Sequence, residues 1–159
     1  MTPAQLATLK AAILAETDAT FVTHRTAGAT GLMQQWFNAA STFVVWKARV
    51  TVAETGIAIN SSELAGLTTA NTNRLSVLAA YSGGQFNPSI ADVRSGFNDV
   101  FGGAGGVNTR AALLALWKRF ATRAEKLFAT GTGSDAAPGL LVFEGSVSEY
   151  EIVQATTQV

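Results

Sequence analysis

The chain has 159 residues, the size of one ordinary domain, and its 11 basic and 11 acidic side chains give a formal net charge of 0 at pH 7. Charged residues make up 14% of the chain, against about 25% in soluble domains, so the surface has weak protection against self-association. The absence of cysteine excludes disulfides and thiolate chemistry, and the neutral charge balance argues against tight binding of nucleic acid.

The low charge leaves two interpretations open. We expect neighbouring subunits to cover much of the surface, while the alternative is a neutral monomer rich in threonine and alanine. No basic leader followed by an apolar stretch opens the chain, and no apolar run approaches the roughly 18 residues of a membrane span. We therefore expect no signal peptide, no membrane contact and assembly in a cytoplasm.

The first forty residues predict two helices. Thr2 and Pro3 are a typical helix start, because threonine caps well and proline suits the first helical position. Residues 17–28 lack a clear apolar period and are predicted to be irregular. A second helix is expected over residues 30–40, where apolar side chains recur at helical spacing.

Residues 42–52, TFVVWKARVTV, are the one segment with clear β character. Its side chains alternate along the chain, which predicts a strand or an extended arm that packs on a helix. Thr51 and Glu54 have the spacing of a capping box, so a short helical turn is expected to follow and to end at Gly56.

The middle of the chain predicts two further helices. One is expected over residues 69–81 and is ended by the Ser-Gly-Gly of residues 82–84. Another is expected to begin at Asn87 and Pro88, because asparagine caps and proline fits the first position. Residues 102–106, GGAGG, are predicted to be a flexible hinge, since they lack the lysine and Ser/Thr of a phosphate-binding loop.

The strongest helix signal runs over residues 108–134. Its apolar side chains fall on one face with a period of 3.6, and Gly131 and Gly133 follow as terminators. Arg119, Arg123 and Lys126 then form a basic stripe along one flank of that face. We expect this stripe to form a salt-bridge edge, either with a neighbouring subunit or within the chain, with DNA as the less favoured alternative.

The chain changes character after Gly133. Residues 131–139, GTGSDAAPG, read as a loop, and residues 140–143 as a short extended apolar run. Ser148 and Glu151 repeat the capping-box spacing, so a short C-terminal helix is expected. The sequence thus divides into a helical domain over residues 1–134, which includes the extended segment at 42–52, and a C-terminal segment over 135–159 that is a candidate interaction arm.

The sequence contains no recognisable catalytic, cofactor or metal site. His24 is the only histidine, and no second ligand or partner carboxylate can be assigned to it. The carboxylates are scattered, and no nucleophile elbow occurs. We therefore expect no enzyme activity, no cofactor, no metal and no small-molecule substrate.

The uneven charge leaves two interpretations open: complementary interfaces between subunits, or two solvated faces. Basic residues dominate between residues 110 and 126, and from Asp135 onward the chain carries four acids and no base. Complementary ends of this kind can steer one subunit onto the next. Together with the extended segment and its tryptophan, they define the candidate interface residues Trp46, Lys47, Arg49, Arg119, Arg123, Lys126, Phe143, Glu144, Glu149, Tyr150 and Glu151.

Three stretches resemble a group of small tailed-bacteriophage proteins. Residues 119–155, RFATRAEKLFATGTGSDAAPGLLVFEGSVSEYEIVQA, carry most of the resemblance. Residues 86–103, FNPSIADVRSGFNDVFGG, and residues 43–54, FVVWKARVTVAE, add to it, whereas residues 17–30 and 55–68 match nothing in that group. The shared motifs are structural rather than catalytic.

The resemblance implies a virion protein, most closely a head–tail connector or adaptor. Such proteins form rings below the portal and grip their neighbours with extended arms or C-terminal segments, so the implied partners are further copies of the chain, the portal and tail proteins, with weak proximity to DNA in a channel. The alternatives are a head decoration or tail component and a small DNA-binding or regulatory module. For the fold we expect a mainly α single domain of five or six helices with one or two short extended segments or arms.

Overall fold

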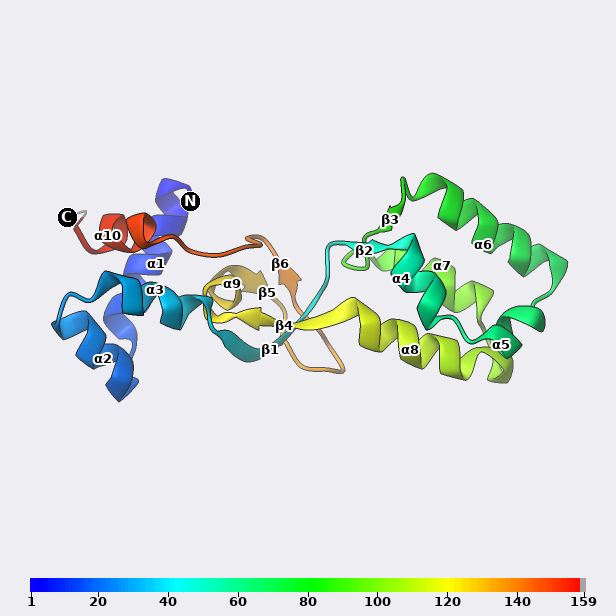
Figure 1. Ribbon diagram of the computed structural model, residues 1–159, viewed down its shortest axis with the longest axis horizontal. Coiled ribbons are helices and arrows are strands. Elements are labelled where there is room, and N and C mark those ends of the chain that lie inside the picture. The colour runs from blue at the N-terminus through cyan, green and yellow to red at the C-terminus, as the bar shows by residue number, and fades with distance from the viewer. Residues whose placement is uncertain (158–159) are drawn as a thin grey trace. The chain divides into compact units, whose positions relative to one another are not determined.

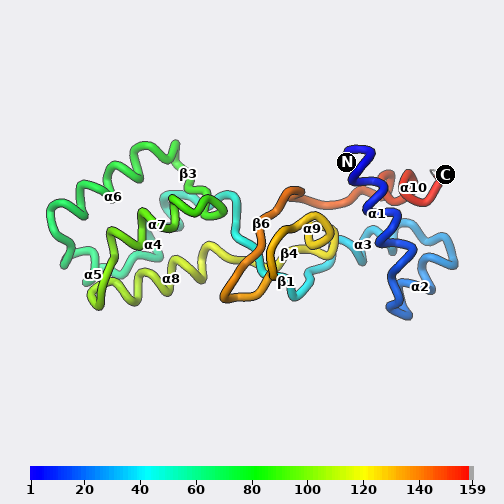
Figure 2. The backbone as a smooth tube through the Cα atoms, turned by 180° about the vertical axis from the view of Figure 1, so that it is seen from behind, coloured from blue at the N-terminus to red at the C-terminus, as the bar shows by residue number. Residues whose placement is uncertain are grey.

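A computed structural model describes residues 1–157 (Figures 1 and 2). It contains ten α-helices, one short 3-10 helix and six short strands over that range. The prediction of a mainly helical protein is confirmed, but five or six helices was too low a number. The chain forms two compact units: unit 1 comprises Met1–Val45 and Phe120–Val159, and unit 2 comprises Trp46–Arg119.

Unit 1 is built from two distant parts of the chain. The first part supplies α1 (Pro3–Ala15), α2 (Ala19–Thr26) and α3 (Thr30–Asn38), and the second supplies α9 (Arg123–Phe128) and α10 (Glu149–Thr157). Helix α10 packs against α1 and α3, so the C-terminal segment is part of the same compact unit as the N-terminus. Their buried side chains form one core: Leu9, Ile13, Phe21, Met33, Phe37, Ala124, Val147, Ile152 and Ala155.

Strands join these helices. β1 (Ala40–Trp46) pairs with β4 (Lys118–Thr122), and β5 (Ala129–Thr130) pairs antiparallel with β6 (Leu140–Leu141). The loop between β5 and β6 returns to β1, where the Val44 N–H donates to the Gly133 carbonyl at 2.7 Å and the Gly139 N–H donates to the Val44 carbonyl at 2.9 Å. A Cβ at Gly133 or Gly139 would overlap the Phe43 ring, so this close approach requires glycine.

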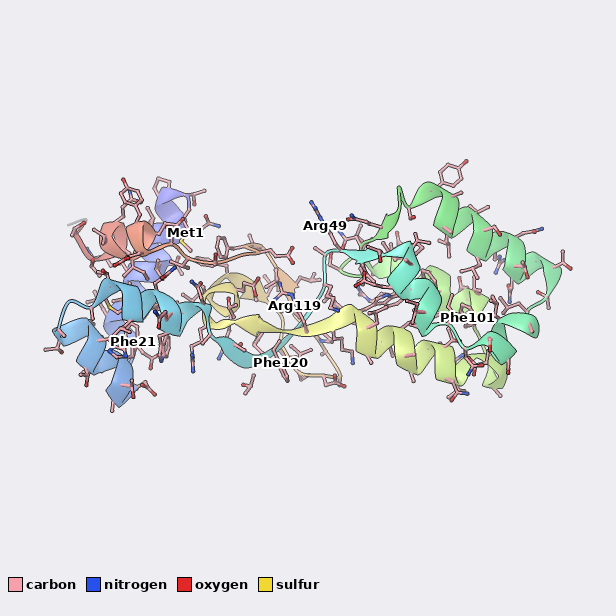
Figure 3. The ribbon with its side chains drawn as sticks, in the orientation of Figure 1. Met1, Phe21, Arg49, Phe101, Arg119 and Phe120 are labelled. Atoms are coloured by element: carbon pink, nitrogen blue, oxygen red, sulfur yellow. The ribbon has the colours of Figure 1, made fainter. Side chains whose placement is uncertain are left out.

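Unit 2 is one continuous segment. It contains β2 (Val50–Thr51), α4 (Val52–Ala58), α5 (Ser61–Ala65), α6 (Thr69–Tyr81), β3 (Gln85–Phe86), α7 (Ala91–Val100), η1 (Ala104–Gly106) and α8 (Val107–Trp117). Strands β2 and β3 pair antiparallel, with Val50 opposite Phe86. The core centres on Phe97, whose ring meets Phe86 at 5.0 Å and Trp117 at 5.2 Å, both edge to face. Figure 3 labels one core residue of each unit, Phe21 and Phe101.

Several predicted element starts are confirmed by the capping geometry. Thr2 caps α1, and the Thr51–Glu54 capping box starts α4. In the box at Ser148, the hydroxyl accepts from the Glu151 N–H, and the Glu151 carboxylate accepts from the Ser148 N–H. Helix α6 has the predicted bounds. In each case a short local pattern is enough, because an N-cap side chain satisfies backbone donors within three residues of itself.

Two predictions about the first half of the chain were wrong. Residues 17–28 include the regular helix α2, because Asp18 Oδ1 accepts from the N–H groups of Thr20 and Phe21 and so caps it. Gly56 does not end α4, which continues through Gly56 to Ala58.

The helix expected from Asn87 and Pro88 begins later. Helix α7 starts at Ala91, because the Asn87 side chain accepts from the N–H and hydroxyl of Ser89 and holds a turn there instead. The expected hinge at residues 102–106 contains η1, and its last residue is packed, since a Cβ at Gly106 would overlap the backbone of Phe101, whereas residues 102–105 are exposed.

The prediction of a single helix over residues 108–134 was also wrong. Helix α8 ends at Trp117, strand β4 follows, and α9 starts afresh from a capping box between Thr122 and Glu125. The interruption follows from pairing with β1: the Ser41 hydroxyl donates to the Ala121 carbonyl at 2.8 Å, and the Arg123 N–H donates to the Ala39 carbonyl at 3.0 Å. Contacts about eighty residues apart override the local helical period.

Candidate functional site

The candidate interface residues fall in both units. Unit 2 holds four of them, and unit 1 holds the other seven. Arg119 lies in β4 and in unit 2, whereas Arg123 and Lys126 lie in α9 and in unit 1. Because α8 ends at Trp117, these three basic residues do not lie on one helix face, as the predicted basic stripe required.

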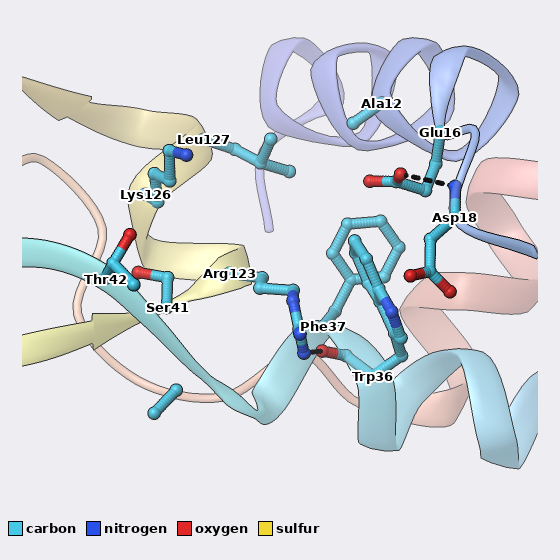
Figure 4. Close-up of a pocket in the computed structure, with 11 residues that line it drawn as sticks. Ala12, Glu16, Asp18, Trp36, Phe37, Ser41, Thr42, Arg123, Lys126 and Leu127 are labelled. Carbon is cyan, nitrogen blue, oxygen red and sulfur yellow. Dashed lines mark hydrogen bonds between the residues drawn. The ribbon is translucent and has the colours of Figure 1, made fainter. Parts of the chain in front are cut away.

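Arg123 and Lys126 instead line a surface pocket of unit 1 with a volume of about 440 Å³ (Figure 4). The pocket draws on α1, the connection between α1 and α2, α3, β1 and α9. Its lining residues are Ala12, Glu16, Asp18, Trp36, Phe37, Ala40, Ser41, Thr42, Arg123, Lys126 and Leu127.

The basic side of this pocket contains one fixed and one exposed cation. The Arg123 guanidinium lies 4.3 Å from the centre of the Trp36 ring and donates to the Trp36 carbonyl at 3.0 Å, so it is held by a cation–π contact and a hydrogen bond together. Lys126 is exposed in the same pocket. Trp36 is itself packed on Phe21, with ring centres 4.7 Å apart.

The acidic side carries two carboxylates that also organise the backbone between α1 and α2. Glu16 Oε1 accepts from the N–H groups of Thr17 and Asp18, each at 2.9 Å, while Asp18 caps α2. Within residues 1–157, no ion pair joins Glu16 or Asp18 to Arg123 or Lys126. The pocket therefore presents opposite charges around an aromatic side chain, an arrangement complementary to a segment that carries both signs of charge.

The acidic C-terminal residues are used largely within unit 1. Glu149 Oε1 accepts from the Thr30 hydroxyl at 2.5 Å, and Glu151 Oε1 pairs with the N-terminal amine at 2.5 Å. Burial raises the pKa of the Glu151 carboxyl, but the hydrogen bonds from the N-terminal amine and from Ser148 outweigh it, so the net pKa lies below the ordinary value. These two carboxylates hold α10 onto the N-terminal helices.

Of the two aromatic candidates near the C-terminus, one packs within the fold and the other is exposed. Phe143 packs against Phe128, with ring centres 5.4 Å apart, and is half-buried. Tyr150 lies on the surface of α10 with 69% of its area exposed, and its hydroxyl accepts from Gln154 at 3.1 Å. Tyr150 is thus the C-terminal aromatic side chain open to a partner, whereas Phe143 supports the fold. Glu144 is exposed and makes contacts within the chain.

Trp46 is the aromatic candidate in unit 2. This ring packs beside the unit 2 core, with the Arg94 guanidinium 4.3 Å from its centre and the Lys118 ammonium at 6.0 Å. The Lys47 N–H donates to the Trp117 carbonyl at 2.8 Å. Arg49 is exposed and its side chain points away from the ribbon (Figure 3), so it is the most accessible cation of this group.

Sequence reasoning missed the pocket residues Glu16, Asp18 and Trp36. Asp18 had a usable signal, since an aspartate before a helix is a common cap. Trp36 had no such signal, because its contact with Arg123 joins residues 87 positions apart.

No protein-family model, curated protein or solved structure matches this chain. Among residues 1–157, the structure brings together no group of three or more histidine, aspartate or glutamate side chains that would hold a metal ion. None of the helices in this range is both long enough and apolar enough to cross a bilayer.

Proposed function

We propose that this chain is a structural subunit that works by self-association, as a head–tail connector or adaptor of a tailed-phage particle. Its copies form a ring at the junction between portal and tail, after assembly in the host cytoplasm. The ring, the portal and tail partners and the virion location come from the resemblance of residues 119–155, 86–103 and 43–54 to that group of proteins.

One observation carries the self-association. Residues 1–157 expose fourteen large apolar side chains to more than a third of their area, in a chain with only 14% charged residues. They occur in both units: Leu14, Leu32, Ile57, Leu64, Val77, Tyr81, Ile90, Val107, Leu114, Phe120, Leu140, Val142, Tyr150 and Val153. Single exposed apolar residues are ordinary, but a surface that combines many of them with few charges favours contact between copies.

The alternative of a DNA-binding module loses its main support. It relied on Arg119, Arg123 and Lys126 lining one face of one helix, and these residues belong to a strand and a separate helix. A head decoration or tail component uses the same kind of surface as a connector, and the position of the protein in a particle map separates these roles.

Electron microscopy of the purified protein tests the proposal. We expect closed rings of uniform size, and rings at the junction between portal and tail in virions. A protein that stays monomeric and is absent from particles contradicts it.

A point variant connects the rings to the exposed surface. Val142→Asp places a charge on a side chain with 73% of its area exposed and is expected to reduce ring formation without loss of folding. Ser146→Asp, which adds the same charge at an exposed polar position four residues later, is the matched control and should leave the rings intact.

A further inference from the structure

Helix α6 is the least covered long helix of unit 2. None of its thirteen residues is fully buried. Leu75, Leu78 and Ala79 lie half-buried against the unit 2 core and hold the helix in place. The remaining sides of α6, which runs along the edge of this unit in Figures 1 and 2, are exposed.

A groove of about 360 Å³ runs between α6 and α7. Most of the surface that lines the groove is apolar. The lining residues are Ala70, Asn73, Arg74, Val77, Leu78, Gly96 and Asp99. Gly96 sets the floor of the groove, because a Cβ there would lie only 3.3 Å from Leu78 Cδ2. The two helices are also tied at one end, where the Asn71 side chain donates to the Val100 carbonyl at 2.9 Å.

Three α6 residues that line the groove, together with Tyr81 further along the same helix, have the spacing of a helix-packing seam. Ala70, Arg74, Val77 and Tyr81 follow one another at intervals of four, three and four residues, which puts them along one face. Val77 is 54% exposed and Tyr81 is 88% exposed. Within residues 1–157 this face has apolar side chains but no element packed over it.

Two opposite charges line this groove. Arg74 and Asp99 are both exposed, and neither forms an ion pair within residues 1–157. Asp99 lies in the last turn of α7, where the helix dipole disfavours a negative charge and a nearby cation would be stabilising. Because the groove carries one cation and one anion, it is complementary to a copy of itself related by a two-fold axis.

We propose that the α6–α7 groove docks onto the same groove of a second copy of this chain. Helix α6 packs against α6 of the second copy across the two-fold axis, with Val77 and Tyr81 covered at the contact. Arg74 of each copy meets Asp99 of the other, so two ion pairs form. The inference rests on the proposed self-association but not on the phage particle, and it joins chains in pairs in addition to any contact around a ring.

Charge reversal tests this arrangement, with sedimentation velocity as the readout. Arg74→Glu sets two pairs of like charges against each other, as does Asp99→Arg, and each variant alone should weaken pairing by at least about tenfold. An equimolar mixture of the two variants restores both opposite-charge contacts in the mixed pair, so it should associate like the wild type. Arg74→Lys keeps the charge, and Asp92→Arg reverses an exposed acid of α7 outside the groove, so both should pair normally.

The outcomes separate this inference from the proposed function. Loss of pairing in both single variants and its recovery in the mixture support the two-fold contact. A wild type that associates but is indifferent to Arg74→Glu, or single variants that fail to recover on mixing, overturn the two-fold contact and leave the self-association in place. A wild type that is monomeric at every concentration overturns both. Circular dichroism of each variant confirms that folding is unchanged.

Discussion

Helices α10 and α6 lie at the surfaces of the two units and use their charged residues in different ways. Helix α10 is tied to the N-terminal part of unit 1 by two carboxylates, since Glu149 accepts from Thr30 and Glu151 pairs with the N-terminal amine. Helix α6 has no buried residue, and its Arg74 forms no ion pair within residues 1–157.

The difference follows from how each unit is built. Unit 1 must bring together two chain segments that are far apart in sequence, and its polar side chains close that unit. Unit 2 is one continuous segment, and its carboxylate tie, in which Glu63 accepts from the Thr109 N–H at 2.7 Å, lies outside the α6–α7 groove, so Arg74 and Asp99 remain available to a partner. Glu149 and Glu151 thus stabilise the fold of unit 1, whereas Arg74 and Asp99 of unit 2 can take part in assembly.

The largest expected effect is in the core of unit 1. Phe21→Ala removes a fully buried ring that contacts Trp36 and Phe37, and we expect the free energy of unfolding to fall by about 3–5 kcal/mol. Tyr150→Ala, on the exposed face of α10, is the control and should change it by no more than about 0.5 kcal/mol. Urea unfolding measures both, and equal losses would contradict the assignment of the core.

The next effect concerns the loop that closes onto β1. Gly133 and Gly28 both have φ of +64°, but a Cβ at Gly133 would overlap Phe43, while a Cβ at Gly28 would meet nothing within 4 Å. Gly28→Ala should lower the free energy of unfolding by about 1–2 kcal/mol, because alanine is strained at this φ. Gly133→Ala should lower it by about 1–3 kcal/mol more, because the added methyl group also overpacks against Phe43. If thermal unfolding shows equal losses, the loop does not pack on Phe43 as described.

A pH titration probes the ties of α10. The folded pKa of Glu151 is lowered, so the carboxylate stabilises the folded chain above the unfolded pKa, near 4.5, and this contribution is lost as the pH falls through the folded pKa. Glu151→Gln should therefore be less stable than the wild type at pH 7, by about 1 kcal/mol, and the difference should shrink below pH 4.5. A difference that stays constant with pH would show that the charge of Glu151 has no part in the tie.

The smallest effect tests the core of unit 2 and has opposite signs at two threonines. The buried Thr55 hydroxyl has no hydrogen-bond partner within residues 1–157, whereas the buried Thr109 hydroxyl accepts from the Asn60 N–H at 3.1 Å. Thr55→Val should raise the free energy of unfolding by about 1 kcal/mol, and Thr109→Val should lower it by about the same amount. Changes of the same sign in chemical denaturation would contradict this contrast.

What could be predicted from the sequence depended on the distance between the residues involved. The capping boxes at Thr51 and Ser148 and the bounds of α6 were predicted, because each signal spans only a few residues. The same box at Thr122 was overlooked within a strong helical period, although it marks the start of α9. Strand β4 had no local signal, since its conformation depends on pairing with β1 about eighty residues away.

The candidate site was likewise predictable only where its signal was local. Arg123 and Lys126 were singled out by their charge, but the sequence did not indicate that they share a pocket with Glu16 and Asp18 more than a hundred residues away. Charge counts predicted that the basic and acidic ends would meet between subunits. In the fold, Glu149 and Glu151 bind the N-terminal helices of their own unit, because the two ends of the chain form one core.

The most direct test of the account is the mass of the wild-type protein in solution, followed by sedimentation velocity from below 1 µM to about 100 µM. The account predicts species larger than one chain that increase with concentration and persist at moderate salt, because apolar surface provides most of the contact. A single species with the 16.5 kDa mass of one chain across the whole range would contradict it.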